Sequence, residues 1–122
     1  MANILIVDDS AFMRLILKDI VRKAGHVAVG EAEDGLKAVQ LYLELSPELV
    51  IMNIVMPELN GILALQRIKK RDPKAKVIIC SATGNQYYVI EAIQSGALDF
   101  IIKPFDESRM IHSIKRALQL TI

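Results

Sequence analysis

Polar side chains follow directly after several apolar runs of this sequence, and they are the residues best able to do chemistry. They comprise two adjacent carboxylates, a carboxamide, a hydroxyl and an ammonium, namely Asp8, Asp9, Asn53, Ser81 and Lys103. Adjacent carboxylates repel each other, so a site that contains both calls for a cation. Oxygen ligands with open positions suit Mg²⁺, which often bridges one or two carboxylates to a phosphate. The acid pair therefore predicts a magnesium site.

The other three side chains supply most of a site for a phosphoryl group. Lys103 can neutralise one phosphoryl oxygen, and the Ser81 hydroxyl can donate a hydrogen bond to another. The set lacks a nucleophile, because the Asn53 carboxamide cannot attack phosphorus to form an acyl phosphate. Each residue alone has an ordinary structural explanation, as a helix cap, a loop hydroxyl or a solvated charge. It is their joint placement that favours phosphoryl binding.

Two hydrophobic patterns alternate along the chain and predict the elements that position these residues. Short apolar runs predict strands, over residues 4–7, 26–30, 49–52, 77–80 and 100–102. Apolar residues at spacings of three and four predict helices, over residues 11–24, 36–45, 62–71, 86–95 and from 107 onward after a cap at Asp106. Phe12 and Leu15 are expected on the inward face of the first helix. Leu36, Val39 and Leu43 are among the apolar residues that predict the second helix.

Five strands that alternate with five helices predict an α/β fold, a doubly wound parallel sheet with right-handed crossovers and helices on both faces. At about 150 residues per domain, residues 1–122 are expected to form a single domain. In an open sheet of this kind, ligands bind beyond the carboxyl ends of the strands, where the strand order reverses. The polar residues are therefore expected to meet at one edge of the sheet.

The composition predicts a small cytoplasmic domain. Lys and Arg number 15 and Asp and Glu 14, which gives a net charge of +1, so no global field favours nucleic acid or a membrane surface. The single cysteine, Cys80, fits a reducing compartment and is expected in the core. A basic run over residues 67–76 is interpreted as a solvated helix end rather than a nucleic-acid site.

Six short motifs are spread over residues 3–120 of the chain. They are Val7-Asp8-Asp9-Ser10, Glu33-Asp34-Gly35, Met56-Pro57-Glu58-Leu59-Asn60-Gly61, Ser81-Ala82, Gly96-Ala97 and Lys103-Pro104-Phe105. Together they resemble the motifs of response-regulator receiver domains, and in particular those of single-domain chemotaxis regulators. The resemblance implies a flavodoxin-like sheet with strand order 2-1-3-4-5, and a single receiver domain without an effector domain.

The resemblance also implies a metal site with an unusual centre. The metal site that the resemblance implies for Mg²⁺ comprises Asp8, Asp9, Asn53 and the main-chain carbonyl of Val55. Asn53 stands where the family places its phosphoacceptor aspartate. The carboxamide is expected to prevent aspartyl phosphate from forming and to weaken Mg²⁺ binding. It also relieves repulsion among clustered carboxylates, so the metal-free fold is expected to be more stable. Because the carboxamide supplies no phosphoryl oxygen for Ser81 and Lys103, we expect an inactive-like resting state.

The remaining implications concern signalling. Lys103 would pair with the phosphoryl group, Ser81 and Phe100 would form the switch, and Pro104 would follow a cis peptide bond. A receiver takes its phosphoryl group from a histidine kinase and then changes a protein-binding face. That face is expected over Gln86–Gln119, with a flagellar motor switch protein as one candidate target. The chain is thus interpreted as a binding switch in a two-component system, and not as an enzyme.

Two sets of alternatives stay open. Asn53 is either an engineered substitution that blocks the acceptor, which the intact remainder of the site favours, or the mark of a natural pseudo-receiver that works without phosphate. A haloacid dehalogenase-type phosphatase would carry Asp-x-Asp after its first strand, whereas Asp8 and Asp9 are adjacent. A flavodoxin-like electron carrier would need a loop there that accepts a flavin phosphate, and two aspartates would repel it.

Overall fold

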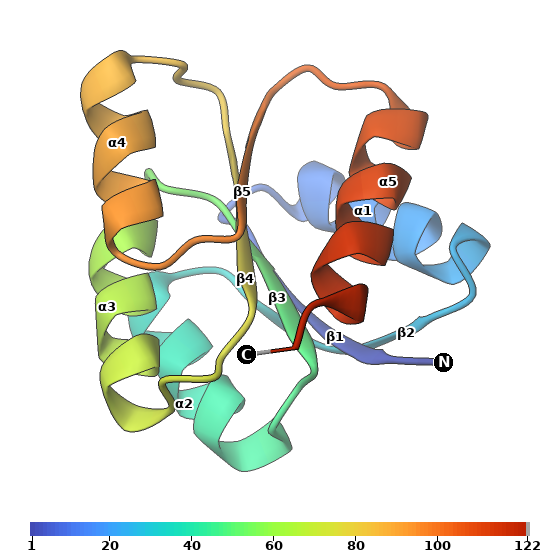
Figure 1. Ribbon diagram of the computed structural model, residues 1–122, viewed down its shortest axis with the longest axis horizontal. Coiled ribbons are helices and arrows are strands. Elements are labelled where there is room, and N and C mark those ends of the chain that lie inside the picture. Colours follow the sequence, from blue (N-terminus) through green and yellow to red (C-terminus); the bar gives the residue numbers. More distant parts are fainter. Residues whose placement is uncertain (122) are drawn as a thin grey trace.

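The computed structural model describes residues 1–121 as strands and helices in strict alternation (Figure 1). The five strands are β1 (Asn3–Val7), β2 (Val27–Ala32), β3 (Leu49–Met52), β4 (Val77–Ser81) and β5 (Asp99–Ile102). The five helices are α1 (Ala11–Lys23), α2 (Gly35–Leu45), α3 (Gly61–Arg71), α4 (Gln86–Gln94) and α5 (Glu107–Gln119). The strands pair in parallel in the order β2-β1-β3-β4-β5, which confirms the predicted order and fold class.

The helices cover both faces of the sheet, as Figure 1 shows. On one face, α1 and α5 bury an apolar cluster that includes Leu17, Ile20 and Ile114. On the other face, α2, α3 and α4 bury a larger cluster around Val50 and Leu65. Both faces of the sheet are therefore covered by apolar side chains, and the polar groups lie at the strand ends. Within residues 1–121, every helix is too short or too polar to cross a lipid bilayer.

The second strand differs most from its predicted bounds. The sequence predicted residues 26–30, but β2 begins at Val27 and continues to Ala32. It is an edge strand that is only partly buried, so its last residues need not be apolar and the hydrophobic pattern does not reveal them. Its pairing with β1 is irregular between Ile4 and Leu5, and Val7 lies opposite Ala32. This register places residue 31 beside the end of β1.

The buried face of α1 agrees only in part with the predicted one, since Ile20 is buried and Ile16 packs on the core as expected. Phe12 and Leu15 are 70% and 60% exposed, so the prediction that they face inward was wrong. The buried stripe of α1 is Leu17, Ile20 and Val21, and at about 100° per residue Phe12 and Leu15 fall to its side or behind it.

In α2, two of the apolar residues whose spacing predicted the helix are not part of its buried face. Leu36 and Leu43 are exposed, whereas Ala38 and Tyr42 are buried. Each helix presents several overlapping apolar stripes, and packing against the sheet selects only one of them.

Caps and close approaches fix where the helices begin and end. The side chains of Ser10, Asp34, Asn60 and Asn85 accept capping hydrogen bonds at the starts of α1 to α4. Asp106 holds the corresponding position before α5, but within the described chain its carboxylate accepts no capping bond, in contrast to the prediction. At α3, a Cβ on Gly61 would overlap the main-chain carbonyl of Asn53, so glycine lets this helix begin directly against the strand end.

A polar cluster joins β5 to α5 and makes a pH-dependent contribution to stability. Asp99 accepts hydrogen bonds from Arg109 at 2.9 and 3.1 Å, from the Ser113 hydroxyl at 2.7 Å and from the Phe100 amide at 2.8 Å. Burial acts to raise the pKa of Asp99, but these bonds outweigh it and hold the pKa below its ordinary value. The folded state therefore favours the ionised carboxylate.

We predict that Asp99→Asn lowers the free energy of unfolding at neutral pH and that the difference from the parent shrinks under acid. A depressed pKa stabilises the fold above the unfolded-state pKa, and this stabilisation disappears as the pH falls through the folded-state value. Urea unfolding of both proteins between about pH 3 and pH 7 measures the difference. A difference that stays constant down to pH 3 would contradict the prediction.

Candidate functional site

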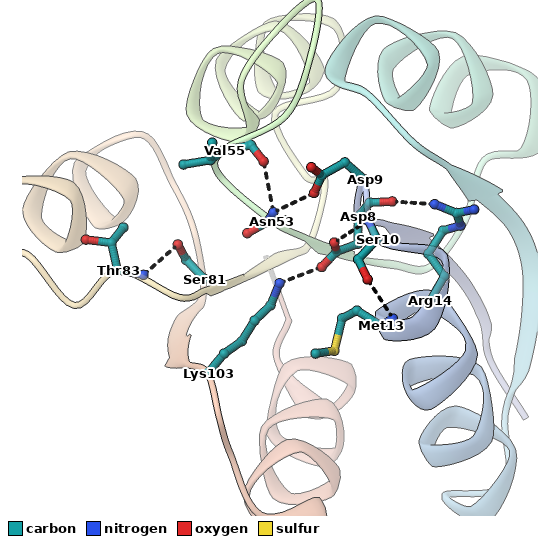
Figure 2. Close-up of polar contacts among 10 residues, drawn as sticks. All are labelled: Asp8, Asp9, Ser10, Met13, Arg14, Asn53, Val55, Ser81, Thr83 and Lys103. Carbon is teal, nitrogen blue, oxygen red and sulfur yellow. Dashed lines mark hydrogen bonds and ion pairs between the residues drawn. The ribbon is translucent and has the colours of Figure 1, made fainter.

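The carboxyl ends of β1, β3, β4 and β5 bring the predicted site residues together (Figure 2). Val7 pairs with Met52, so the residues that follow them, Asp8 and Asn53, are neighbours at the centre of the sheet. The Asn53 amide donates a main-chain hydrogen bond of 2.9 Å to the Val7 carbonyl, which fixes this pairing one residue further. The parallel sheet thus places on one edge residues that are up to 95 positions apart in the chain.

Asp8 is the most tightly held side chain of the site. It is only 1% exposed, and its Oδ2 lies 2.7 Å from the Lys103 Nζ. Its Oδ1 accepts a hydrogen bond of 3.0 Å from the Ser10 amide at the start of α1. A buried carboxylate needs a partner of opposite charge, and here Lys103 from the far end of the sheet supplies it.

Asn53 lies between two oxygen atoms and donates to both. Its Nδ2 is 3.2 Å from Asp9 Oδ1 and 3.0 Å from the main-chain oxygen of Val55. Both neighbours are acceptors, so the amide must present its nitrogen to them and not its oxygen. The carboxamide nitrogen therefore lies between two of the oxygen atoms that were predicted to bind Mg²⁺, and it donates a hydrogen bond to each of them.

The switch candidates lie at the adjoining strands. Ser81, the last residue of β4, is 1% exposed, and its hydroxyl oxygen accepts a hydrogen bond of 3.3 Å from the Thr83 amide. Phe100 on β5 is half-buried and packs against the cluster beneath α2, α3 and α4. Lys103 follows β5 and is joined to Pro104 by a cis peptide bond, as the resemblance implied.

A sequence profile decides the family. The response regulator receiver domain family matches residues 4–115 of the chain. The chain belongs to this family. The receiver is similar to "Chemotaxis protein CheY" of Thermotoga maritima, with 56% identity over 114 residues, which are 93% of this chain and 95% of that protein. It is 55% identical over 116 residues to the protein of the same name from Bacillus subtilis, covering 95% and 97% of the two chains.

Solved receiver structures agree. The response regulator domain of Thermotoga maritima CheB superimposes with a TM-score of 0.90 at 39% identity, over 98% of each chain. The CheY chain of the "CheX-CheY-BeF3-Mg+2 complex from Borrelia burgdorferi" gives 0.93 at 33% identity, over 97% of this chain and 90% of that one. The chain is thus a CheY-like receiver of the chemotaxis type, as the sequence predicted.

The oxygen atoms of the site suit a hard cation, but the carboxamide competes for them. Asp8 and Asp9 contribute carboxylates and Val55 a carbonyl, which are ligand types that Mg²⁺ prefers. Two of these oxygens already accept hydrogen bonds from Asn53 Nδ2. In the described part of the chain, no group of three acidic, histidine or cysteine side chains lies close enough to hold a metal. The receiver site therefore offers oxygen atoms of the kind that suit Mg²⁺, but Asn53, the fourth predicted ligand, turns its Nδ2 and not its oxygen toward two of them.

Neighbouring groups have structural roles. Cys80 is buried beside the site, and burial raises the pKa of its thiol to about 12, so it stays protonated and inert at neutral pH. Lys69 in the basic run donates to the carbonyls of Pro73 and Ala75, so it closes the end of α3 as expected. His26 accepts a hydrogen bond from the Ala2 amide.

The sequence reading missed Arg14. Its guanidinium donates to the main-chain oxygen of Asp8 at 2.8 Å and to Glu31 Oε1 at 3.0 Å. Glu31 on β2 thereby holds the side chain that contacts the Asp8 main chain. The sequence does place an arginine six positions after Asp8, which could have indicated the contact. Its partner Glu31 could be identified only once the register of β2 against β1 was known.

Apolar side chains are exposed on α4 and β5 of the receiver. Tyr87, Tyr88, Ile90, Ile93 and Ile102 belong to the large hydrophobic residues left in solvent. Tyr87 and Tyr88 pack edge to face, with ring centroids 5.4 Å apart. All five lie within the predicted face Gln86–Gln119. Exposed apolar residues that gather on one face are typical of protein-binding sites.

Proposed function

We propose that this receiver is blocked at its phosphoacceptor position by Asn53. The observation that carries the proposal is the position of the Asn53 amide, between Asp9 and the Val55 carbonyl and beside the Asp8–Lys103 pair. An aspartate at that position would stand among the groups that a phosphoryl transfer site requires. A carboxamide has no nucleophilic oxygen to form an acyl phosphate. The switch is then held in its unphosphorylated condition.

The remaining site residues keep the roles that the resemblance implies. Asp8, Asp9, Asn53 and the Val55 carbonyl would hold Mg²⁺, which would supply positive charge to offset that of a phosphoryl group. Lys103 and Ser81 contact that group, and Ser81 acts with Phe100 as the switch. In the structure, Lys103 pairs with Asp8.

The proposed partners follow from the family. A histidine kinase addresses the phosphoryl site, and a downstream protein binds the face over Gln86–Gln119, with a flagellar motor switch protein as one candidate. The exposed apolar residues of α4 and β5 support this face. That a receiver of this kind binds another protein is supported by the complex of the related Borrelia burgdorferi CheY with CheX. We propose residues 1–122 as one cytoplasmic receiver unit that binds proteins and does not turn over a substrate.

The origin of Asn53 has two explanations, and the site supports an engineered block. Ser81, Lys103 and both acids remain in one cluster with short contacts. A receiver that had long worked without phosphate would be free to lose these residues. A natural pseudo-receiver remains the alternative, and its mark would be a site that stays inactive after the aspartate is restored.

We predict that the chain binds Mg²⁺ at least about tenfold more weakly than its Asn53→Asp variant. The variant gains an anionic ligand, and the metal no longer has to displace an amide that makes two hydrogen bonds. Amide chemical shifts of Asp9 and Val55 during a Mg²⁺ titration measure the affinities. Glu44→Gln removes an exposed carboxylate on α2 and serves as a control that should not change them. Equal affinities for parent and variant would overturn the proposed metal site.

A further inference from the structure

Arg14 connects the acid pair to the edge strand of the sheet. Its side chain is only 17% exposed. Nη1 donates to the Asp8 main-chain oxygen at 2.8 Å, and Nε donates to Glu31 Oε1 at 3.0 Å (Figure 2 shows the first contact). The other Glu31 oxygen lies 2.9 Å from Lys18 Nζ. Hydrogen bonds from Lys18 and Arg14 hold the pKa of Glu31 below its ordinary value, so the anchor stays ionised at neutral pH.

The hydrogen bond from Arg14 to the Asp8 carbonyl is the second contact that holds the Asp8 main chain against β2. The Asp8 amide donates 3.0 Å to the Ala32 carbonyl of β2, and the Asp8 carbonyl reaches Glu31 of β2 through Arg14. Both peptide groups of Asp8 are thereby tied to the same strand. The second of these groups links Asp8 to Asp9, so its orientation sets the direction in which the Asp9 carboxylate leaves the main chain.

We propose that Arg14 is a positioning residue for the Mg²⁺ ligands, which orients Asp9 by clamping the Asp8 carbonyl to Glu31. This inference rests on the proposed function for its metal. Arginine suits the task because its planar fork donates in two directions at once, from Nε and from Nη1, whereas lysine offers a single ammonium. Groups that orient metal ligands in this way commonly affect the affinity ten- to a hundredfold.

A purely electrostatic role for Arg14 predicts the opposite sign. A positive charge close to a cation site repels the cation, so its removal should tighten Mg²⁺ binding. Loss of positioning should weaken it. Lys18 provides the matched control, because it contacts the same glutamate and carries the same charge on the same helix, but makes no contact with Asp8. Arg14→Met and Lys18→Met therefore differ chiefly in the clamp.

The first measurement uses the chain without metal. The Ser10 amide bonds to Asp8 Oδ1, so its hydrogen exchange reports on the order of the acid loop. We expect Arg14→Met to speed exchange at Ser10 about tenfold and to leave Ile20 and Val21 in α1 unchanged. Lys18→Met should leave all three unchanged. If Arg14→Met does not fold, Glu31→Gln takes its place, because it removes the charged anchor and keeps Arg14.

The second measurement is the Mg²⁺ affinity in the Asn53→Asp background. We expect Arg14→Met to weaken it about tenfold and Lys18→Met to leave it equal or slightly tighter. Tighter or unchanged binding with Arg14→Met, or parental exchange at Ser10, would overturn the positioning role. If the Asn53→Asp protein itself binds no Mg²⁺, the proposed function fails, and the exchange of Ser10 alone decides whether Arg14 orders the acid loop.

Discussion

Replacing Asn53 with aspartate is expected to lower the free energy of unfolding of the metal-free receiver by about 2 kcal/mol at neutral pH, and Mg²⁺ is expected to recover most of the loss. The substitution exchanges a donor for an acceptor at a position where both neighbours are acceptors. Asn53 Nδ2 bonds to Asp9 Oδ1 and to the Val55 carbonyl, and the residue is 8% exposed. A carboxylate there loses both bonds and faces the charge of Asp9.

The sign of the pH dependence follows from that repulsion. The new carboxylate has a raised pKa in the folded state, so its cost is largest at neutral pH and falls as acid protonates it. Urea unfolding with and without Mg²⁺ at pH 7 and pH 4 measures both effects. Asn60→Asp is the control, because it adds the same charge at the start of α3, where aspartate caps a helix as well as asparagine does. An Asn53→Asp variant as stable as its parent without metal would contradict the account.

Removing the charge of Lys103 is expected to cost about 3 kcal/mol of unfolding free energy. The Lys103 ammonium lies 2.7 Å from Asp8 Oδ2, and the two side chains are 14% and 1% exposed. Lys103→Met leaves the Asp8 carboxylate buried without a cationic partner. The Ser10 amide remains as a hydrogen-bond donor to Asp8, but it carries no compensating charge.

A double-mutant cycle tests this explanation. Asp8→Asn in the Lys103→Met background removes the unpaired charge, so the double variant should recover a large part of the stability that Lys103→Met lost. Lys18→Met is the control for loss of a lysine from a pair that is more exposed, and it should change the unfolding free energy by less than about 1 kcal/mol. If Lys103→Met is as mild as Lys18→Met, the buried pair is not the stabilising contact proposed.

The positions of the site residues at the strand ends were predictable, because residues that follow the strands of a parallel sheet lie along the same edge. Asp8, Asn53 and Lys103 each follow an apolar run, and such runs end at the same edge of the sheet. The motifs around them then indicated the family. Neither inference required any side-chain contact, which is why both were available from the sequence.

The contacts inside the site depended on geometry that the pattern does not contain. Lys103 follows β5, and its side chain must extend past the ends of β4 and β3 to reach an acid that follows β1. In the structure, the acid that it reaches is Asp8. The link from Arg14 to Glu31 depends on the register of β1 against β2, including an irregularity that no hydrophobic pattern records. Phe12 was misplaced for a similar reason, because an apolar residue near a stripe need not belong to it.

Mass spectrometry of the intact protein can show whether Asn53 blocks an otherwise competent phosphoacceptor position. The chain and its Asn53→Asp variant are incubated side by side with Mg²⁺ and acetyl phosphate, and their intact masses are recorded immediately afterwards. We expect one added phosphoryl group on the variant and none on the chain. A phosphoryl group on the unsubstituted chain would show that the acceptor lies elsewhere, and an unlabelled variant would show that the surrounding site does not support phosphoryl transfer.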